Sequence, residues 1–230
     1  MLAEVYSFAK VVGVTFAALF PIVNPLGGAP IFLGLTRQYP PSAQKVLARK
    51  IAVYGFVLLA TSLLLGTEIL SFFGITLTVV QIAGGLVVAS TGWSLLHQPD
   101  VPPSTQPATA TLDDALEHAF YPLTLPITVG PGSISIAITI GARIRSDAGP
   151  GFEHGYPPRF VAALVGMLLV CGLIVVCYGN ADRLVRRLGH SGTNILTRLS
   201  AFILLSIGVQ FLWNGLSTGI AQLLGNHSVG

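Results

Sequence analysis

The sequence predicts an all-α integral membrane protein with six transmembrane helices. The helices are expected to form two inverted-topology three-helix repeats, in which helices one and four are discontinuous. Three observations predict this fold: an apolar composition, six long apolar runs and a proline pattern that occurs twice. Of the 230 residues, 52% are hydrophobic and 9% are charged, and the mean hydropathy is +0.75. Soluble domains carry about 25% charged residues, so this chain has too few charges to cover a globular surface in water.

Six apolar runs are each long enough to cross a membrane. A helix rises about 1.5 Å per residue, so about 20 apolar residues span roughly 30 Å of hydrocarbon. The runs are residues 11–36, 51–73, 76–96, 119–142, 160–179 and 199–220. Glu4 and Lys10 precede the first run, which is too long for the core of a secretory signal. We therefore expect this run to remain as the first span.

Lysine and arginine residues predict the orientation of the chain. Eight of them lie in the connections 37–50 and 180–198, and the other four lie on the opposite side of the predicted topology. Cytoplasmic connections carry the excess of basic residues. The sequence therefore predicts that both termini lie outside.

A long polar segment, residues 97–117, separates the third span from the fourth. It holds four prolines and a Ser/Thr-rich middle, a composition typical of a linker. It divides a single transmembrane domain, 1–230, into a first three-span repeat, 1–96, and a second one, 118–230. The acidic residues at the end of the linker predict a short interfacial helix that leads into the fourth span.

The prolines of the first and fourth spans recur at one offset. An aromatic residue precedes the first proline of each segment, and the prolines repeat 101 residues apart. The matched pairs are Pro21 with Pro122, Pro25 with Pro126, and Pro30 with Pro131. Such self-similarity indicates an internal repeat. Because each half holds an odd number of spans, the two halves must insert in opposite orientations, an architecture common among secondary transporters.

Both proline segments are expected to interrupt their helices. Proline removes a backbone donor and clashes with the preceding turn. Interrupted backbone at membrane depth is tolerated where it lines a cavity, and each restarting helix would aim free N–H groups into that cavity. The substrate-binding residues predicted from this pattern are Asn24, Pro25, Gly27, Gly28, Thr124, Thr128, Gly130, Gly132 and Ser133. The alternative is a pair of proline kinks with glycine contacts between helices.

Glu68 is an acidic residue well inside an apolar run. Ionisable side chains within spans are costly and usually functional, so Glu68 is a candidate for carrying a coupling proton. The alternative is an interfacial carboxylate, because Gly74 lies six residues later at the end of the span. Glycines in the third and sixth spans are predicted to be positions of close helix packing. They are Gly84, Gly85, Gly92 and Gly208.

Two motifs carry a resemblance to a known family. Residues 19–36 read LFPIVNPLGGAPIFLGLT, and residues 120–133 read FYPLTLPITVGPGS. These segments closely resemble the first- and fourth-span motifs of the MarC family, and residues 81–85 and 198–201 resemble its third- and sixth-span starts. The resemblance covers nearly the whole chain. It implies a six-span inner-membrane protein related to LysE-type exporters, with small neutral amino acids as the substrate class.

These features together predict a secondary transporter for a small solute, a neutral amino acid or similar metabolite, in the bacterial inner membrane. The expected partners are the solute, the lipid bilayer and a coupling proton or sodium ion. We expect no enzymatic activity, cofactor, metal or nucleic-acid binding, because the histidines lack metal-ligand spacing and the basic residues form no continuous face. A non-transporting structural or regulatory membrane protein and a passive channel are the alternatives.

Overall fold

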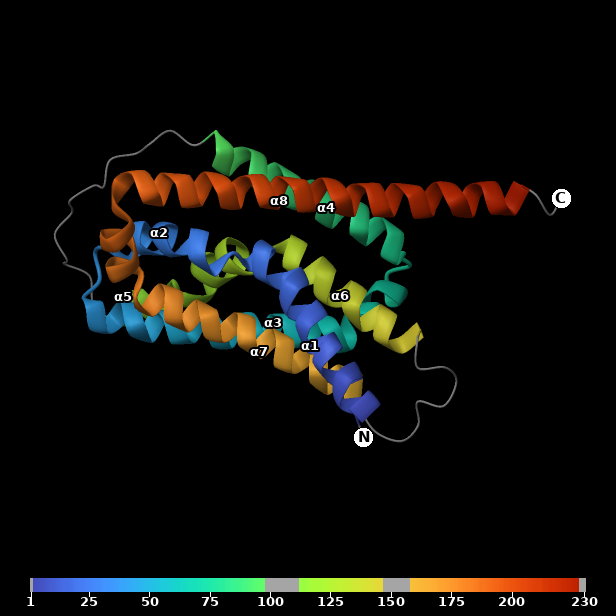
Figure 1. Ribbon diagram of the computed structural model, residues 1–230, viewed down its shortest axis with the longest axis horizontal. Coiled ribbons are helices and arrows are strands. Elements are labelled where there is room, and N and C mark those ends of the chain that lie inside the picture. Colours follow the sequence, from blue (N-terminus) through green and yellow to red (C-terminus); the bar gives the residue numbers. More distant parts are fainter. Residues whose placement is uncertain (1, 98–111, 147–157, 228–230) are drawn as a thin grey trace.

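Helices account for all the regular structure in the described part of the chain (Figure 1). The structure is a computed structural model that describes residues 2–97, 112–146 and 158–227. Its elements are α1 (Leu2–Val23), α2 (Pro25–Thr36), α3 (Pro41–Phe72), α4 (Leu77–Leu96), α5 (Leu112–Glu117), η1 (Ala119–Thr128), α6 (Pro131–Ser146), α7 (Pro158–Gly179) and α8 (Ala181–His227). No strand occurs within those three ranges. The all-α prediction is therefore confirmed.

Each of the six predicted spans coincides with a long apolar helix or a broken pair of helices. Five segments are long and apolar enough to cross a membrane, and a sixth results when η1 and α6 are counted as one broken span. The five are Glu4–Thr36, Pro41–Phe72, Leu77–Leu96, Pro158–Gly179 and Ser191–Gln222. Several begin earlier than the apolar runs, because polar residues continue the same helix beyond the apolar stretch. The proline-rich part of the predicted linker, 98–111, lies outside the described residues, whereas α5 confirms the short helix before the fourth span.

The first span is interrupted at Asn24, as the sequence predicts. Asn24 has φ 47° and ψ 57°, the left-handed conformation that asparagine tolerates better than most residues. Its N–H closes α1 by bonding to the Phe20 carbonyl at 2.8 Å, and its side-chain Oδ1 accepts from the Gly27 N–H at 3.0 Å to begin α2. One residue thus ends one helix and caps the next.

The fourth span is interrupted more sharply. Its first half, η1, is a wide π-type helix with extended backbone at Tyr121 and Leu125, and α6 leaves it at an angle of 70°. The hydroxyls of Thr124 and Thr128 donate to the carbonyls five residues earlier, both at 2.7 Å. These hydroxyls donate to backbone carbonyls within a segment whose prolines, Pro122 and Pro126, have no N–H group to donate.

The first and fifth spans run in the same direction. In the first half of α7, Gly166 packs against Thr15 of α1. At the end of α7, the ring of Tyr178 stacks on Phe32 of α2, with centroids 4.7 Å apart. The residue numbers at these contacts increase together along the two spans, as expected for parallel helices.

The second and fourth spans also run in the same direction. Tyr54 of α3 packs edge-on against Phe120 of η1, with ring centroids 5.8 Å apart. Twelve residues further along α3, Gly66 faces Ile138 of α6. The fourth span therefore runs parallel to the second and opposite to the first.

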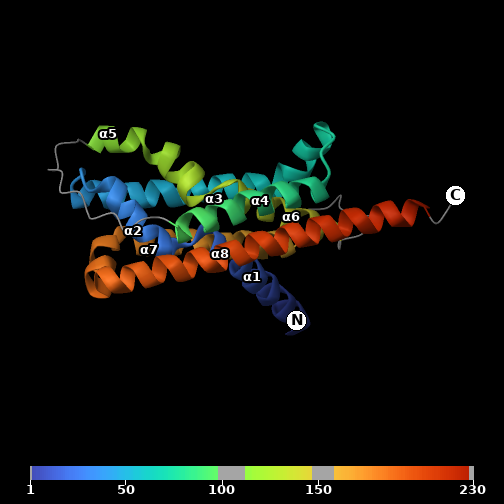
Figure 2. The same cartoon turned by 90° about the horizontal axis from the view of Figure 1, so that it is seen from above.

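The third and sixth spans form a tight antiparallel pair, α4 against α8 (Figures 1 and 2). A Cβ added to Gly85 would lie 2.7 Å from the Leu212 nitrogen, and one added to Gly92 would lie 2.5 Å from the Leu205 nitrogen. From the other helix, a Cβ on Gly208 would lie 2.3 Å from the nitrogen of Ala89. These close approaches confirm the predicted role of the glycines, because small residues let membrane helices pack backbone to backbone.

The two basic connections lie at the same end of the bundle. Figure 1 shows the link from α2 to α3 and the link from α7 to α8 together at its left-hand side. The start of α1, the turn from α3 to α4 and the far end of α8 lie toward the opposite end. The structure thus groups the connections as the alternating topology predicts.

Candidate functional site

Tyr178, at the end of α7, joins the two interrupted spans. A Cβ added to Gly28 of α2 would lie 2.4 Å from the Tyr178 hydroxyl oxygen, so only glycine leaves room for it there. The same hydroxyl lies 3.2 Å from Thr128 Oγ1 of η1, and both side chains are buried. Because Thr128 uses its one hydroxyl hydrogen on the Leu123 carbonyl, Tyr178 is the donor in this bond. One side chain therefore contacts both breaks.

Replacing Tyr178 with phenylalanine is expected to weaken the contact between the two breaks without removing the aromatic ring. Hydrogen bonds between membrane helices contribute roughly 0.6 kcal/mol on average, up to about 1.7 kcal/mol. Thermal unfolding of Y178F, T128V and the double variant in detergent should therefore give a coupling energy within that range. Tyr54→Phe is the matched control. A coupling energy of zero would contradict the assigned hydrogen bond.

A small cavity of about 110 Å³ lies at the second break. One wall is the turn from η1 to α6, and the others come from α1, α4 and α8. The lining residues are Ile22, Val87, Val88, Thr91, Pro126, Ile127, Thr128, Gly130, Pro131, Gly132, Ser133 and Leu204. Because Ile22 lies two residues before Asn24, the cavity adjoins both breaks. Its volume is well below the roughly 300 Å³ of the smallest drug-sized pockets, which suits a small solute.

The first turn of α6 lines this cavity. Pro131 has no N–H, and the Ile134 N–H bonds to the Gly130 carbonyl at 3.2 Å. First-turn N–H groups have no partner within their own helix, and Gly132 and Ser133 occupy that turn. The N-terminus of a helix carries a partial positive charge, which favours a carboxylate or another anion.

The predicted hydroxyl residues are buried and bonded to backbone. Thr124 and Thr128 donate within η1, and Ser133 Oγ donates to the Gly130 carbonyl at 2.8 Å. Each oxygen keeps acceptor capacity, so a solute ammonium or hydroxyl could still donate to Thr128 or Ser133. Thr124 does not line the cavity.

The predicted residues of the first break lie beside the cavity rather than in its wall. The lining does not include Asn24, Pro25, Gly27 or Gly28. The expectation that α2 offers free N–H groups is wrong for Gly27 and Gly28, because Asn24 accepts both bonds, the first through Oδ1 and the second through its carbonyl at 2.8 Å. Because Asn24 caps α2, few N–H groups at the start of this helix are free to bind a ligand.

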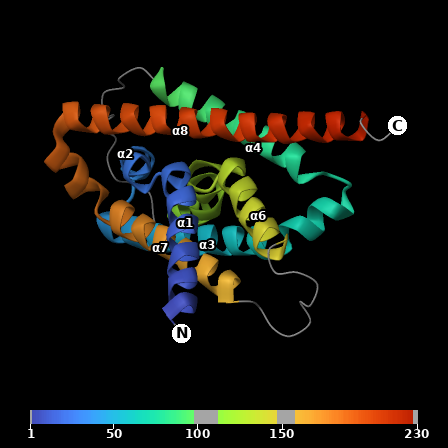
Figure 3. The same ribbon diagram turned by 45° about the vertical axis from the view of Figure 1, so that its right-hand side comes forward.

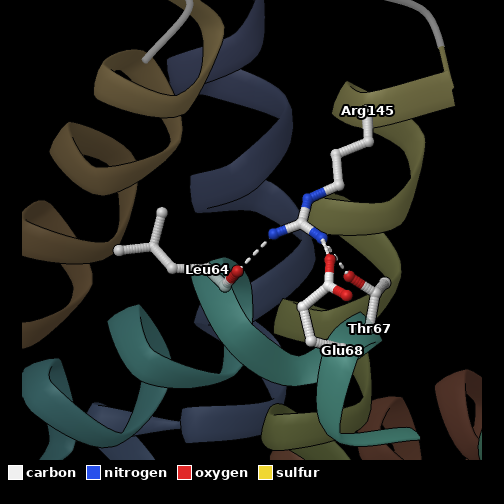
Figure 4. Close-up of polar contacts among 4 residues, drawn as sticks. All are labelled: Leu64, Thr67, Glu68 and Arg145. Atoms are coloured by element: carbon white, nitrogen blue, oxygen red, sulfur yellow. Dashed lines mark hydrogen bonds and ion pairs between the residues drawn. The ribbon is translucent and has the colours of Figure 1, made fainter. Parts of the chain in front are cut away.

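Glu68 lies away from the cavity, on α3, and is paired with Arg145 of α6 (Figure 4). Arg145 also donates to Thr67 Oγ1 at 2.6 Å and to the Leu64 carbonyl. Arg145 follows Ser133 by twelve residues, about 18 Å of helix rise. The Glu68 side chain is 68% exposed, and the pair joins the outer end of α6 to α3.

Neither Tyr178 nor the α4 wall of the cavity is predicted from the sequence. Tyr178 ends an apolar run, where an aromatic residue is typical of a membrane-interface anchor. Its role depends on α7 packing against two segments that are distant in sequence. Thr91 is a polar residue within the third span, a signal that could have been read. Within the part of the chain described, no three His, Cys, Asp or Glu side chains group as metal ligands.

Comparison with known proteins gives a family match over most of the chain. The family model described as MarC family integral membrane protein matches residues 9–220. A UPF0056 membrane protein of Methanocaldococcus jannaschii is 31% identical over 201 residues, which cover 87% of this chain and 93% of that protein. The UPF0056 inner membrane protein MarC is 29% identical in Citrobacter koseri and 28% identical in Salmonella typhimurium, each alignment covering 90% of this chain and 94% of the relative. No solved structure matches. The chain belongs to the MarC family.

Proposed function

We propose that this integral membrane protein of the MarC family is a secondary transporter for a small solute of the neutral amino acid class. The observation that carries the proposal is the cavity of about 110 Å³ at the start of α6, adjoining the break in the first span. Secondary transporters commonly hold their substrate at such interrupted helices near the middle of the membrane. The relatives' printed name, inner membrane protein, supports the same location for this chain.

Two inverted three-span repeats are the architectural part of the proposal. Exchanging α1 with η1, α2 with α6, α3 with α7 and α4 with α8 turns each main helix contact into another contact that is also made. The packing of α1 on α7 corresponds to that of η1 on α3, and the packing of α2 on α8 corresponds to that of α6 on α4. The parallel and antiparallel pairings of the spans agree with this exchange. They support a pseudo-two-fold axis in the membrane plane.

The substrate carboxylate is placed at the N-terminal turn of α6, beside Gly132 and Ser133. The amino group would face the acceptor oxygens of Thr128 and the nearby carbonyls. The apolar walls from Val88 and Leu204 would accommodate a small side chain. The predicted residues of the first break then act mainly in shaping the pocket, through Gly28 and its contact with Tyr178.

Transport would proceed by rocking of one repeat against the other, with a proton or sodium ion as the driver. Glu68 remains the candidate for coupling, acting through its pair with Arg145 rather than in the pocket. The basic end of the bundle is placed in the cytoplasm, which leaves both termini outside. A reporter fused to the C-terminus tests this orientation, and a cytoplasmic signal would contradict it.

Uptake by purified protein in proteoliposomes tests the transport proposal. A panel of labelled neutral amino acids, from glycine to leucine, should include at least one with saturable uptake and accelerated counterflow. Imposed proton and sodium gradients then identify the coupling ion. Flux without saturation would indicate a channel, and absence of flux for the whole panel would remove the amino-acid proposal in favour of a structural or regulatory role.

A further inference from the structure

A second and larger cavity lies near one end of the bundle, separate from the proposed transport site. Its volume is about 270 Å³, and it lies between α1, α6 and α7. Figure 3 shows the start of α1 beside α7, with the far end of α6 on the same side of the bundle. The lining residues are Ser7, Lys10, Val11, Val14, Thr15, Ile140, Arg143, Ile144 and Arg159.

Three basic side chains, one from each helix, converge on this cavity. They are Lys10 of α1, Arg143 of α6 and Arg159 of α7, and none of the described residues that line it is acidic. Glu4 lies six residues before Lys10, so the described charges in this region remain net positive. Arg159 interacts with a further group, so Lys10 and Arg143 are the pair on which the inference rests. Nearby Arg145 is already directed toward Glu68.

The rest of the lining divides into hydroxyl and apolar side chains. Ser7 and Thr15 add hydroxyl groups, and the remaining four lining residues are valine or isoleucine. Such a cavity offers cationic donors for an anion and an apolar surface for what is attached to it. Lysine and arginine side chains at a membrane surface attract the negatively charged headgroups of anionic lipids.

We infer that this cavity binds an anionic group, a phosphate or carboxylate, that carries an apolar portion. The anion would lie between Lys10 and Arg143, where charge-assisted hydrogen bonds are strongest. The apolar portion would lie along the valine and isoleucine side chains of α1 and α6. Two sources supply this chemistry: an anionic phospholipid of the bilayer and a soluble organic anion.

Ligand-dependent thermal stability of the purified full chain in neutral detergent tests the inference without any measurement of flux. The probes are dioleoylphosphatidylglycerol, dioleoylphosphatidylcholine, inorganic phosphate and butyrate. We expect at least one anionic probe, but not phosphatidylcholine, to raise the unfolding temperature saturably. In K10Q/R143Q the concentration for half-maximal stabilisation should rise about tenfold or more, because two charge-assisted contacts are lost.

The matched control is K45Q/R49Q, which removes two exposed basic side chains at the opposite end of the bundle. It should respond as the unmodified chain does. Stabilisation by phosphatidylglycerol alone assigns the site to lipid, and stabilisation by phosphate or butyrate assigns it to a soluble anion. If the double variant does not fold, K10Q and R143Q are measured singly. An equal loss in the control, or no saturable stabilisation by any anionic probe, would overturn the inference.

Discussion

Replacing Gly132 with leucine is expected to abolish solute flux while the chain still inserts and remains helical. A Cβ at this position would lie 2.0 Å from Val88 Cγ2, and the rest of the side chain would enter the cavity that Gly132 lines. Overpacking of this kind costs about 1 to 3 kcal/mol of folding stability, which leaves the helices inserted, but the leucine side chain takes the space in which the solute would bind. Counterflow in proteoliposomes should therefore fall to the level of protein-free vesicles.

Three further variants distinguish a specific effect on the proposed site from general destabilisation of the protein. Gly172→Leu is the control, because a Cβ there meets nothing within 4 Å. Gly28→Leu should also reduce flux, since its Cβ would displace the Tyr178 hydroxyl. The double variant Gly132→Ala with Val88→Ala should retain part of the flux that Gly132→Leu loses. The smaller residue at position 88 makes room for the methyl group added at position 132. Normal flux in both G28L and G132L would show that the site is placed wrongly.

Replacing Gly208 with alanine is expected to cause a large loss of stability for the addition of a single methyl group. The added Cβ would lie 2.3 Å from the backbone nitrogen of Ala89 and 2.7 Å from its Cα. Backbone atoms cannot rotate away as a side chain can, so α4 and α8 must separate. Membrane helices associate largely through close van der Waals packing, and the expected cost is about 1 to 3 kcal/mol, read as a lower unfolding temperature in detergent.

Gly219→Ala on the same helix provides the matched control for this effect. Its Cβ would lie 3.5 Å from Thr78 Cγ2, an ordinary contact. Both variants gain the same intrinsic helix propensity, about 1 kcal/mol, so their difference isolates the steric term. If G208A and G219A unfold at the same temperature, the close α4–α8 approach is not present in the protein.

The observed cavity lies at the second helix break, whereas the sequence predicts a polar pocket formed equally by both breaks. The sequence pattern treats the two breaks as equivalent, with two helix ends directed at a ligand. In the structure Asn24 satisfies the N–H groups of Gly27 and Gly28 within the break itself. The 101-residue offset aligns Asn24 with Leu125, an apolar residue that has no side-chain acceptor for such a cap. The asymmetry leaves the α6 end as the one that lines the cavity.

What the sequence by itself determined was the membrane fold, the span positions and the location of both helix breaks. These follow from local chemistry: apolar length sets the spans, proline removes backbone donors, and Asn24 can adopt a left-handed conformation. The close-packing role of the glycines is also predictable from the sequence, because small residues in membrane helices typically mark positions where two helices approach closely. The residues alone also carried the two motifs that led to the family.

Only the tertiary structure decided which residues meet. Tyr178 contacts both Gly28 and Thr128, which are 100 residues apart, because the end of α7 lies against both helix breaks. Glu68 is paired with Arg145 rather than directed at the pocket, because parallel packing brings the ends of α3 and α6 together. Lys10, Arg143 and Arg159 line one cavity because α6 runs opposite to α1 and α7, so its end lies beside their starts. Charges and hydroxyls carry no local signal of their partners, so their neighbours become known only once the helices have packed.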